Sequence, residues 1–331
     1  MPRVLSGIQP SGQLHLGNYA GAIRQFLDLQ HAGNEMFVFV ASYHALTSTR
    51  DPAALKANIH QIVVDYLAFG LDPAKTAIYV QQDVPEVTEL AWLLSCVTPM
   101  SWMEKAVSYK DKLAKGISAN VGLFTYPILQ AADILAVDAD VVPVGRDQVQ
   151  HLELARDMAA RFNEEFKAPA DKPVFKLPAY RLAAEAAVLP GIDGEKMSKS
   201  YGNTIDPFQD EKGLRKRIMA IKSDSKGVNE VKDPDTCNTF QIFRAIAGKD
   251  DPRTVALAGR YRDPGAEGFG YGHAKQALFE LLLDHFGPAR AKRGALMADP
   301  GYIAQVLQQG AAAARTKARA VTDRARAAVG L

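Results

Sequence analysis

Short apolar runs alternate with helix-spaced apolar stripes along the first part of the chain. The stripes include one formed by Leu55, Ile59, Ile62, Val63, Tyr66 and Leu67. The runs are typical of strands buried on both faces of a parallel sheet, and they occupy residues 3–9, 36–41, 76–81 and 140–145. Because strands and helices alternate, the pattern predicts an α/β fold with a parallel sheet.

Two other stretches show helical patterns alone. Strand signals stop between residues 86 and 137, which predicts a helical insertion. From residue 212 onward every periodic segment is helical, at 214–221, 239–247, 253–261, 274–286 and 302–329. We therefore expect an α/β catalytic domain over residues 1–190 with its insertion at about 86–137, a loop over 191–206, and an all-helical region over 207–331.

Composition narrows the protein class. The 331 residues are 47% hydrophobic and 23% charged, as in ordinary globular proteins of about two domains. No apolar run is long enough for a membrane span, and the N-terminus turns polar too early for a signal peptide. Cys96 and Cys237 lie far apart without metal-ligand spacing, so we expect no disulfide framework, no protein-bound metal and a cytoplasmic location.

The net charge of +2 says little about partners, but its distribution is uneven. After Gly301 the chain carries five Arg and Lys residues against one Asp. Such a basic tail is compatible with contact to phosphates and with a solvated helix face.

The first candidate site is a glycine-rich turn after the first strand, Gly-Ile-Gln-Pro-Ser-Gly at 7–12 followed by His-Leu-Gly-Asn at 15–18. A helix is predicted to begin near Asn18, and free N–H groups at a helix start favour phosphate. Gly17 leaves room for a nucleotide against the backbone, and His15 can donate to a phosphate oxygen. A plain strand-to-helix turn capped by Asn18 explains this segment alone equally well.

The second candidate site is the run Lys196-Met197-Ser198-Lys199-Ser200, in a loop rich in glycine. Two lysines three residues apart can reach negative charge that develops on a triphosphate. Basic loops are common, but this pentapeptide following the His-Leu-Gly-Asn turn in an α/β domain is a specific combination. Asp133 stands among apolar residues of a helix, so we expect its carboxylate to be buried and paired.

These motifs resemble the two signatures of class I aminoacyl-tRNA synthetases, over the whole length of the chain. The turn at 7–18, Tyr-Pro-x-x-x-Ala-Ala-Asp at 126–133 and Val-Pro-Val-Gly-x-Asp-Gln at 142–148 resemble the tryptophanyl members of that class. The resemblance implies a Rossmann-type catalytic domain, a helical domain that binds the tRNA anticodon, a homodimer, and no role for membrane or DNA. It also implies activation of L-tryptophan by ATP with Mg²⁺, followed by transfer to tRNA(Trp).

The resemblance also implies roles for particular residues. Lys196, Lys199 and His15 would act catalytically on phosphate charge. ATP would contact Gln9, Pro10, Ser11, Gly17, Asn18, Gly145, Arg146, Asp147, Val188 and the loop residues Lys196, Met197, Ser198, Lys199 and Ser200. Tryptophan would contact Tyr126, Gln130, Gln148, His44 and Asp133, whose carboxylate suits the lone N–H of an indole because it only accepts hydrogen bonds.

Two residues depart from the family pattern. Asn18 replaces the final histidine of the first signature, as it does in the tryptophanyl subfamily. Gln130 stands where some bacterial tryptophan enzymes carry Met, and its spacing to Tyr126 and Asp133 is also reminiscent of tyrosyl-tRNA synthetase. Three alternatives remain open: a tyrosyl enzyme, an adenylyltransferase that makes a small cofactor, and a non-catalytic RNA-binding paralogue. His44, at the end of a strand, is equally compatible with a purely structural role.

Overall fold

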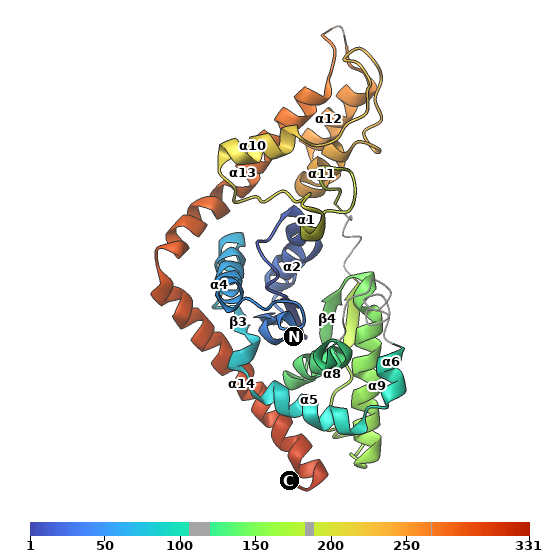
Figure 1. Ribbon diagram of the computed structural model, residues 1–331, viewed down its shortest axis with the longest axis vertical. Coiled ribbons are helices and arrows are strands. Elements are labelled where there is room, and N and C mark those ends of the chain that lie inside the picture. The colour runs from blue at the N-terminus through green and yellow to red at the C-terminus, as the bar shows by residue number, and fades with distance from the viewer. Residues whose placement is uncertain (106–119, 183–188, 266) are drawn as a thin grey trace.

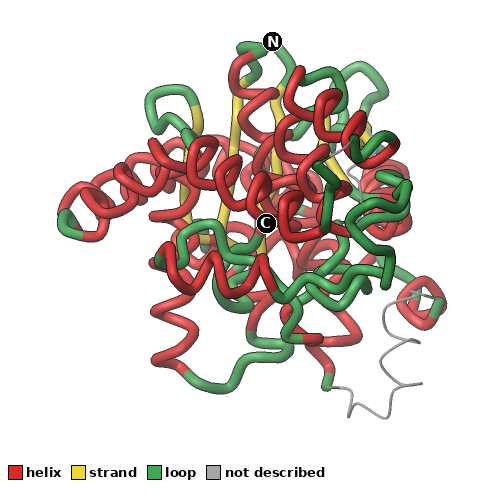
Figure 2. Tube along the Cα trace, turned by 90° about the horizontal axis from the view of Figure 1, so that it is seen from above, coloured by secondary structure: helices red, strands yellow, loops and turns green. Residues whose placement is uncertain are grey.

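A computed structural model describes residues 1–105, 120–182, 189–265 and 267–331, in which five parallel strands form one sheet. The spatial order is β3-β2-β1-β4-β5. Figure 2 shows the strands side by side with helices around them. Because β1 lies between β2 and β4, the order reverses beside β1, where α/β sheets form a crevice at the carboxyl ends of the strands. The strands are β1 (Arg3–Ile8), β2 (Glu35–Val40), β3 (Thr76–Val80), β4 (Val141–Val144) and β5 (Ala179–Leu182).

The first four strands confirm the α/β pattern, whereas β5 was not predicted. β5 lies at the edge of the sheet and pairs in parallel with β4. All four of its residues are exposed, so its sequence, Ala-Tyr-Arg-Leu, carries no buried apolar run. Pairing of the backbone with β4, rather than burial of side chains, makes this segment a strand, and periodicity does not detect such pairing.

Apart from the edge strand β5, both faces of the sheet are buried, as in other parallel sheets that helices cover on two sides. Val38 and Val40 of β2 join an apolar cluster on one face, and Phe37 and Phe39 join a second cluster on the other. The first cluster continues without a break into the helices after residue 207, for example to Phe243. The sheet therefore shares one core with the helical region.

The helices around the sheet follow the predicted order. The stretch 86–137 holds only helices among its described residues, as the sequence predicted. Among the described residues of the first two thirds of the chain, the α-helices are α1 (Leu16–Asn18), α2 (Arg24–His31), α3 (Ser42–Ala45), α4 (Pro52–Phe69), α5 (Glu86–Val97), α6 (Met100–Glu104), α8 (Val121–Ala136) and α9 (Val149–Glu165). One π-helical segment, η1 (Tyr19–Ile23), and three 3₁₀ turns, η2 (Gln81–Asp83), η3 (Arg146–Gln148) and η4 (Lys199–Tyr201), complete the set.

Helices are the only regular secondary structure in the last third of the described chain. α13 is longer than the predicted 274–286, because it runs through Pro288 and a following segment of helix-favouring Ala, Arg and Lys residues. No helix among the described residues combines the length and apolar character that crossing a membrane requires. The helices are α10 (Glu211–Met219), α11 (Asn238–Ala247), α12 (Pro252–Arg262), α13 (Tyr271–Met297) and α14 (Pro300–Val329).

The last helix, α14, returns from the helical region to the sheet (Figure 1). It packs along the edge strand β3, where a Cβ atom added to Gly310 would lie 1.9 Å from the carbonyl oxygen of Ile78. Only glycine permits so close an approach of helix and strand. β3 pairs with β2 on one side only, and α14 covers its other edge, which no strand pairs with.

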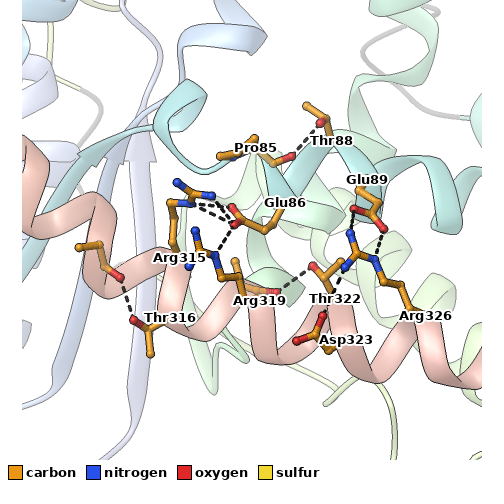
Figure 3. Close-up of polar contacts among 12 residues, drawn as sticks. Pro85, Glu86, Thr88, Glu89, Arg315, Thr316, Arg319, Thr322, Asp323 and Arg326 are labelled. Carbon is orange, nitrogen blue, oxygen red and sulfur yellow. Dashed lines mark hydrogen bonds and ion pairs between the residues drawn. The ribbon is translucent and has the colours of Figure 1, made fainter. Parts of the chain in front are cut away.

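Ion pairs reinforce this packing. Figure 3 shows Arg315 and Arg319 of α14 converging on Glu86 at the start of α5, with Arg326 on Glu89 one turn later. The other two basic residues of the tail pair with carboxylates outside α14, Lys317 with Glu35 and Arg324 with Asp138. The sequence left the basic tail open to phosphate contact or to solvent, but all five cations instead tie α14 to the sheet domain.

The contact at Gly310 generates a stability prediction. Gly310→Ala should lower the unfolding temperature, because overpacking against a backbone typically costs about 1–3 kcal/mol. Gly294→Ala on α13 is the matched control, since nothing lies within 4 Å of its added Cβ. That control should leave the temperature unchanged or raise it slightly through better helix propensity. Calorimetry measures the unfolding temperature of each variant. A value for Gly310→Ala equal to or above that of the unmodified protein would contradict the close packing of α14 on β3.

Candidate functional site

A cavity of about 510 Å³ opens at the carboxyl ends of β1, β2 and β4. This is the edge at which α/β sheets bind ligands. Residues from α2, α3, α8 and η3 complete its walls. Seven residues predicted to bind ligands line it: Gln9, His44, Tyr126, Gln130, Asp133, Gly145 and Gln148.

Asp133 lies on α8 with only 3% of its surface exposed, so the prediction of a buried, paired carboxylate is confirmed. His44 Nε2 lies 2.8 Å from its Oδ2. Gln81 Nε2 donates to both carboxylate oxygens at 2.8 Å. Burial raises the pKa of Asp133, and the bonds from His44 and Gln81 oppose that rise. Sequence analysis missed Gln81, because a lone glutamine after a strand matches no motif.

A second group of polar residues follows one wall of the cavity. The Tyr126 hydroxyl lies 2.7 Å from Nε2 of His151, a buried α9 residue that sequence analysis missed. Gln130 Nε2 donates to Gln148 Oε1 at 3.4 Å, and Gln148 donates in turn to Asp147 at 2.9 Å. Burial lowers the pKa of His151. This wall can meet a polar ligand group with both donors and acceptors.

The helix after the first turn begins at Leu16, two residues before the predicted start near Asn18, and the alternative in which Asn18 caps it is wrong. His15 is the N-cap, and its Nδ1 accepts from the Gly17 N–H at 3.1 Å. Asn18 occupies the third helical position and accepts from the backbone N–H of His15 at 3.2 Å, which completes a capping box. A histidine can replace the usual Asn or Ser here because its ring nitrogen also accepts a hydrogen bond.

The charge state of His15 follows from this geometry. Burial, together with the nearby Lys199 cation, lowers its pKa to about 4, so the ring is neutral at physiological pH. Because Nδ1 accepts a hydrogen bond, the ring proton sits on Nε2. His15 can therefore donate one hydrogen bond to a ligand without carrying charge.

Asn203, which sequence analysis missed, organises the lysine loop. Its buried side chain accepts from the Ser198 N–H at 2.8 Å. It donates to Asp193 at 2.8 Å and to the carbonyl of Lys196 at 3.1 Å. Gly191 allows this, because a Cβ there would lie 2.3 Å from the Asn203 amide. One buried amide thus fixes the backbone at both Lys196 and Ser198.

The structure brings the lysine loop against the first turn. Lys199 Nζ donates to the carbonyl oxygen of Gly12 at 2.8 Å and lies 3.5 Å from the hydroxyl of Ser11. Burial lowers the pKa of Lys199 to about 8. Two segments 187 residues apart in sequence therefore meet at one site, with a cation beside backbone and hydroxyl groups.

The remaining residues predicted to contact ATP differ in how deeply they are buried. Lys196 and Ser200 are exposed, whereas Met197 is packed in the core, so its side chain faces away from solvent. Pro10 is buried, while Arg146 and Asp147 are exposed on η3 beside Gly145. Gly17 stands close to Met197, whose Cβ would lie 3.6 Å from an added Cβ. Val188 lies outside the described residues.

Comparisons with known proteins agree with these features. A family model described as class I tRNA synthetases (W and Y) matches residues 1–287. A tryptophan–tRNA ligase of Rhodopirellula baltica is 49% identical over 99% of both chains. One from Fusobacterium nucleatum is 48% identical over 100% of this chain and 98% of its own. The crystal structure of tryptophanyl-tRNA synthetase from Campylobacter jejuni with ADP and tryptophan has a TM-score of 0.89 at 45% identity, covering 99% of this chain and 100% of its own.

The coupling of His15 to Lys199 is measurable. In Lys199→Ala the pKa of His15 should rise from about 4 but stay below its ordinary value, because the cation is removed and burial remains. NMR titration of the imidazole, assigned with a His15→Gln variant, measures this. Lys196→Ala, at the exposed lysine of the same loop, should leave the His15 pKa unchanged. An unaltered His15 titration in Lys199→Ala would refute the electrostatic coupling of the two side chains.

Proposed function

The chain belongs to the family of class I tRNA synthetases for tryptophan and tyrosine, and we propose that it works as a tryptophan–tRNA ligase. It activates L-tryptophan with ATP and transfers the aminoacyl group to tRNA(Trp). Two observations carry this function: a buried carboxylate in the wall of a cavity at the carboxyl ends of the strands, and a lysine loop that contacts the turn after β1. The tyrosyl and adenylyltransferase alternatives are not favoured, because the full-length relatives above are tryptophan ligases.

Tryptophan enters the cavity with its indole toward Asp133. Indole offers one N–H donor and no acceptor, so an acceptor-only carboxylate suits it. Tyr126, Gln130 and Gln148 stand on the polar wall, where they suit the amino and carboxylate groups of the amino acid. His44 also lines the cavity and pairs with Asp133.

ATP binds along the two signatures, with Mg²⁺ held by its phosphates. No group of three or more His, Cys, Asp or Glu side chains suited to a metal occurs among the described residues, and Mg²⁺ commonly binds through substrate phosphates. Lys196, Met197, Ser198, Lys199 and Ser200 cover the triphosphate. The other proposed ATP contacts are Gln9, Pro10, Ser11, Gly17, Asn18, Gly145, Arg146, Asp147 and Val188.

The reaction has two displacement steps. The tryptophan carboxylate attacks the α-phosphorus of ATP, and pyrophosphate leaves. The terminal ribose hydroxyl of the tRNA then attacks the acyl carbon, and AMP leaves. The protein acts by holding the reactants in line and by placing charge where negative charge develops. Lys196 and Lys199 supply that charge, and neutral His15 donates one hydrogen bond to a phosphate oxygen.

The helical region after residue 207 is the proposed tRNA-binding region. α10 exposes Lys212, Arg215 and Lys216, which suit contact with backbone phosphates. The cations of α14 contribute less, because they already pair with carboxylates. Charging that is insensitive to changes in the anticodon would contradict this assignment.

We also propose a homodimer in the cytoplasm. Three large apolar side chains are strongly exposed on neighbouring helices: Trp92 on α5, Met100 on α6 and Val121 on α8. Large apolar side chains exposed to solvent are candidates for a subunit interface. Sedimentation at the mass of a single chain at micromolar concentration would contradict the dimer. Two free cysteines, one exposed and one buried, fit a reducing compartment.

The lysine assignment predicts a kinetic phenotype. Lys196→Ala and Lys199→Ala should each slow adenylate formation roughly 10²–10³-fold and leave tryptophan binding nearly unchanged, because both cations act mainly on charge in the transition state. Stopped-flow measurement of adenylate formation checks this, with exposed Lys172→Ala as the control. Normal adenylate rates in both loop variants would refute it.

Lys199 also predicts a pH dependence. Its folded-state pKa of about 8 means that the cation is present below this pH and is lost above it. In the unmodified enzyme kcat/KM for ATP should therefore fall as pH rises through about 8. Lys199→Arg should remove that fall, since arginine stays charged.

The function itself is tested by ATP–pyrophosphate exchange with each of the twenty amino acids. Tryptophan should give the fastest exchange, and phenylalanine should be rejected strongly, because it would supply no donor to the acceptor site that Asp133 keeps for the ligand. Sites built for such a bond discriminate by ~10⁴–10⁵. Asp133→Ala should impair tryptophan activation and narrow its advantage over phenylalanine. Tyrosine-dependent exchange that exceeds the tryptophan-dependent rate would overturn the proposal.

A further inference from the structure

A buried amide lies directly behind the carboxylate at the base of the cavity. Gln81 follows β3 at the start of η2, and its side chain has no exposed surface. An amide buried this way is costly unless its donor and acceptor are both paired. Both ends of Gln81 are paired, and one pairs with Asp133.

The backbone fixes which way this amide faces. Gln81 Oε1 accepts from the backbone N–H of Tyr43 at 2.8 Å. A backbone N–H can only donate, so the carbonyl end of the amide must face Tyr43. The NH₂ end therefore faces Asp133 and can only donate to its oxygens, which lie at 2.8 Å. This orientation makes both oxygens of Asp133 acceptors.

The hydrogen bonds leave the two oxygens of Asp133 unequal. Within the described part of the chain, Oδ2 accepts from Gln81 and pairs with His44, whereas Oδ1 accepts from Gln81 alone. A carboxylate oxygen has two lone pairs, so Oδ1 keeps room for one further donor. The carboxylate lines the cavity, where that donor would be a ligand group.

We propose that Gln81 is a positioning residue for tryptophan selection, because its amide holds Asp133 with Oδ1 free to accept the indole N–H. The inference rests on the proposed function. Gln81 touches Asp133 and Tyr43 rather than the reacting atoms, so it acts through the carboxylate. The same bonds also join the end of β3 to α3, so the test must separate selection from mere stability.

The test pairs two changes, one in the protein and one in the amino acid. Gln81→Met keeps the length of the side chain and removes its donor. β-(3-Benzothienyl)alanine keeps the bicyclic shape of tryptophan and replaces the indole N–H with sulfur. Amino-acid-dependent ATP–pyrophosphate exchange gives kcat/KM for each amino acid with each enzyme. Gln82→Met is the matched control, because the neighbouring glutamine is exposed.

The unmodified enzyme should prefer tryptophan over the sulfur analogue. In Gln81→Met this preference should fall about tenfold, which corresponds to about 1.4 kcal/mol, mainly through a higher KM for tryptophan. Gln82→Met should keep the preference. If Gln81→Met does not fold, Gln81→Glu serves instead, since it retains the shape and sets a second carboxyl group against Asp133; there too the preference should fall.

Two other results have distinct meanings. An equal loss of kcat/KM for both amino acids, with their ratio unchanged, would overturn the proposal and leave Gln81 a purely structural residue. Absence of tryptophan-dependent exchange in the unmodified enzyme would instead overturn the proposed function. The two failures are therefore distinguishable in one set of assays.

Discussion

The close packing of α14 on β3 holds the base of the cavity in place. Gly310 brings the helix against the carbonyl of Ile78, and pairs such as Arg315 with Glu86 secure the helix after that contact. β3 ends at Val80, and the next residue is Gln81, whose amide holds Asp133. The edge strand is thus pinned between β2 and α14. A helix at the end of the chain thereby helps to fix a carboxylate deep in the sheet domain.

A second connection links the helical region to the lysine loop. Arg293 of α13 donates to buried Asp65 of α4 at 2.8 Å and lies over the ring of Phe208, 4.9 Å from its centre. Arg290 donates to the carbonyl of Pro207 at 2.6 Å. Pro207 and Phe208, which these arginines contact, lie where the chain leaves the lysine loop. Because one apolar cluster also spans the two regions, the helices that we expect to meet tRNA are packed against the parts that we propose bind ATP.

The features that the sequence predicted differ in physical origin from those it did not. The first four strands are apolar runs, which burial on two faces demands, and local pattern reveals them. β5 is exposed and depends on pairing with β4, so it has no such pattern. Gln81 and Asn203 have their roles only because folding buries the first against Asp133 and the second against the lysine loop. A single amide side chain has no recognisable pattern in the sequence. The basic residues of the tail could be identified from the sequence, but the carboxylates that they pair with could not.

Desolvation governs the charges where the lysine loop meets the first turn. His15 is buried and neutral, and burial lowers the pKa of Lys199 to about 8. The direct partners of Lys199 are a carbonyl and a hydroxyl, both neutral, so its charge is only partly compensated. A carboxylate in their place would form a strong ion pair that a phosphate would have to break. Neutral partners hold the lysine in place and yield to a polyanion at small cost, which suits the triphosphate binding that we propose.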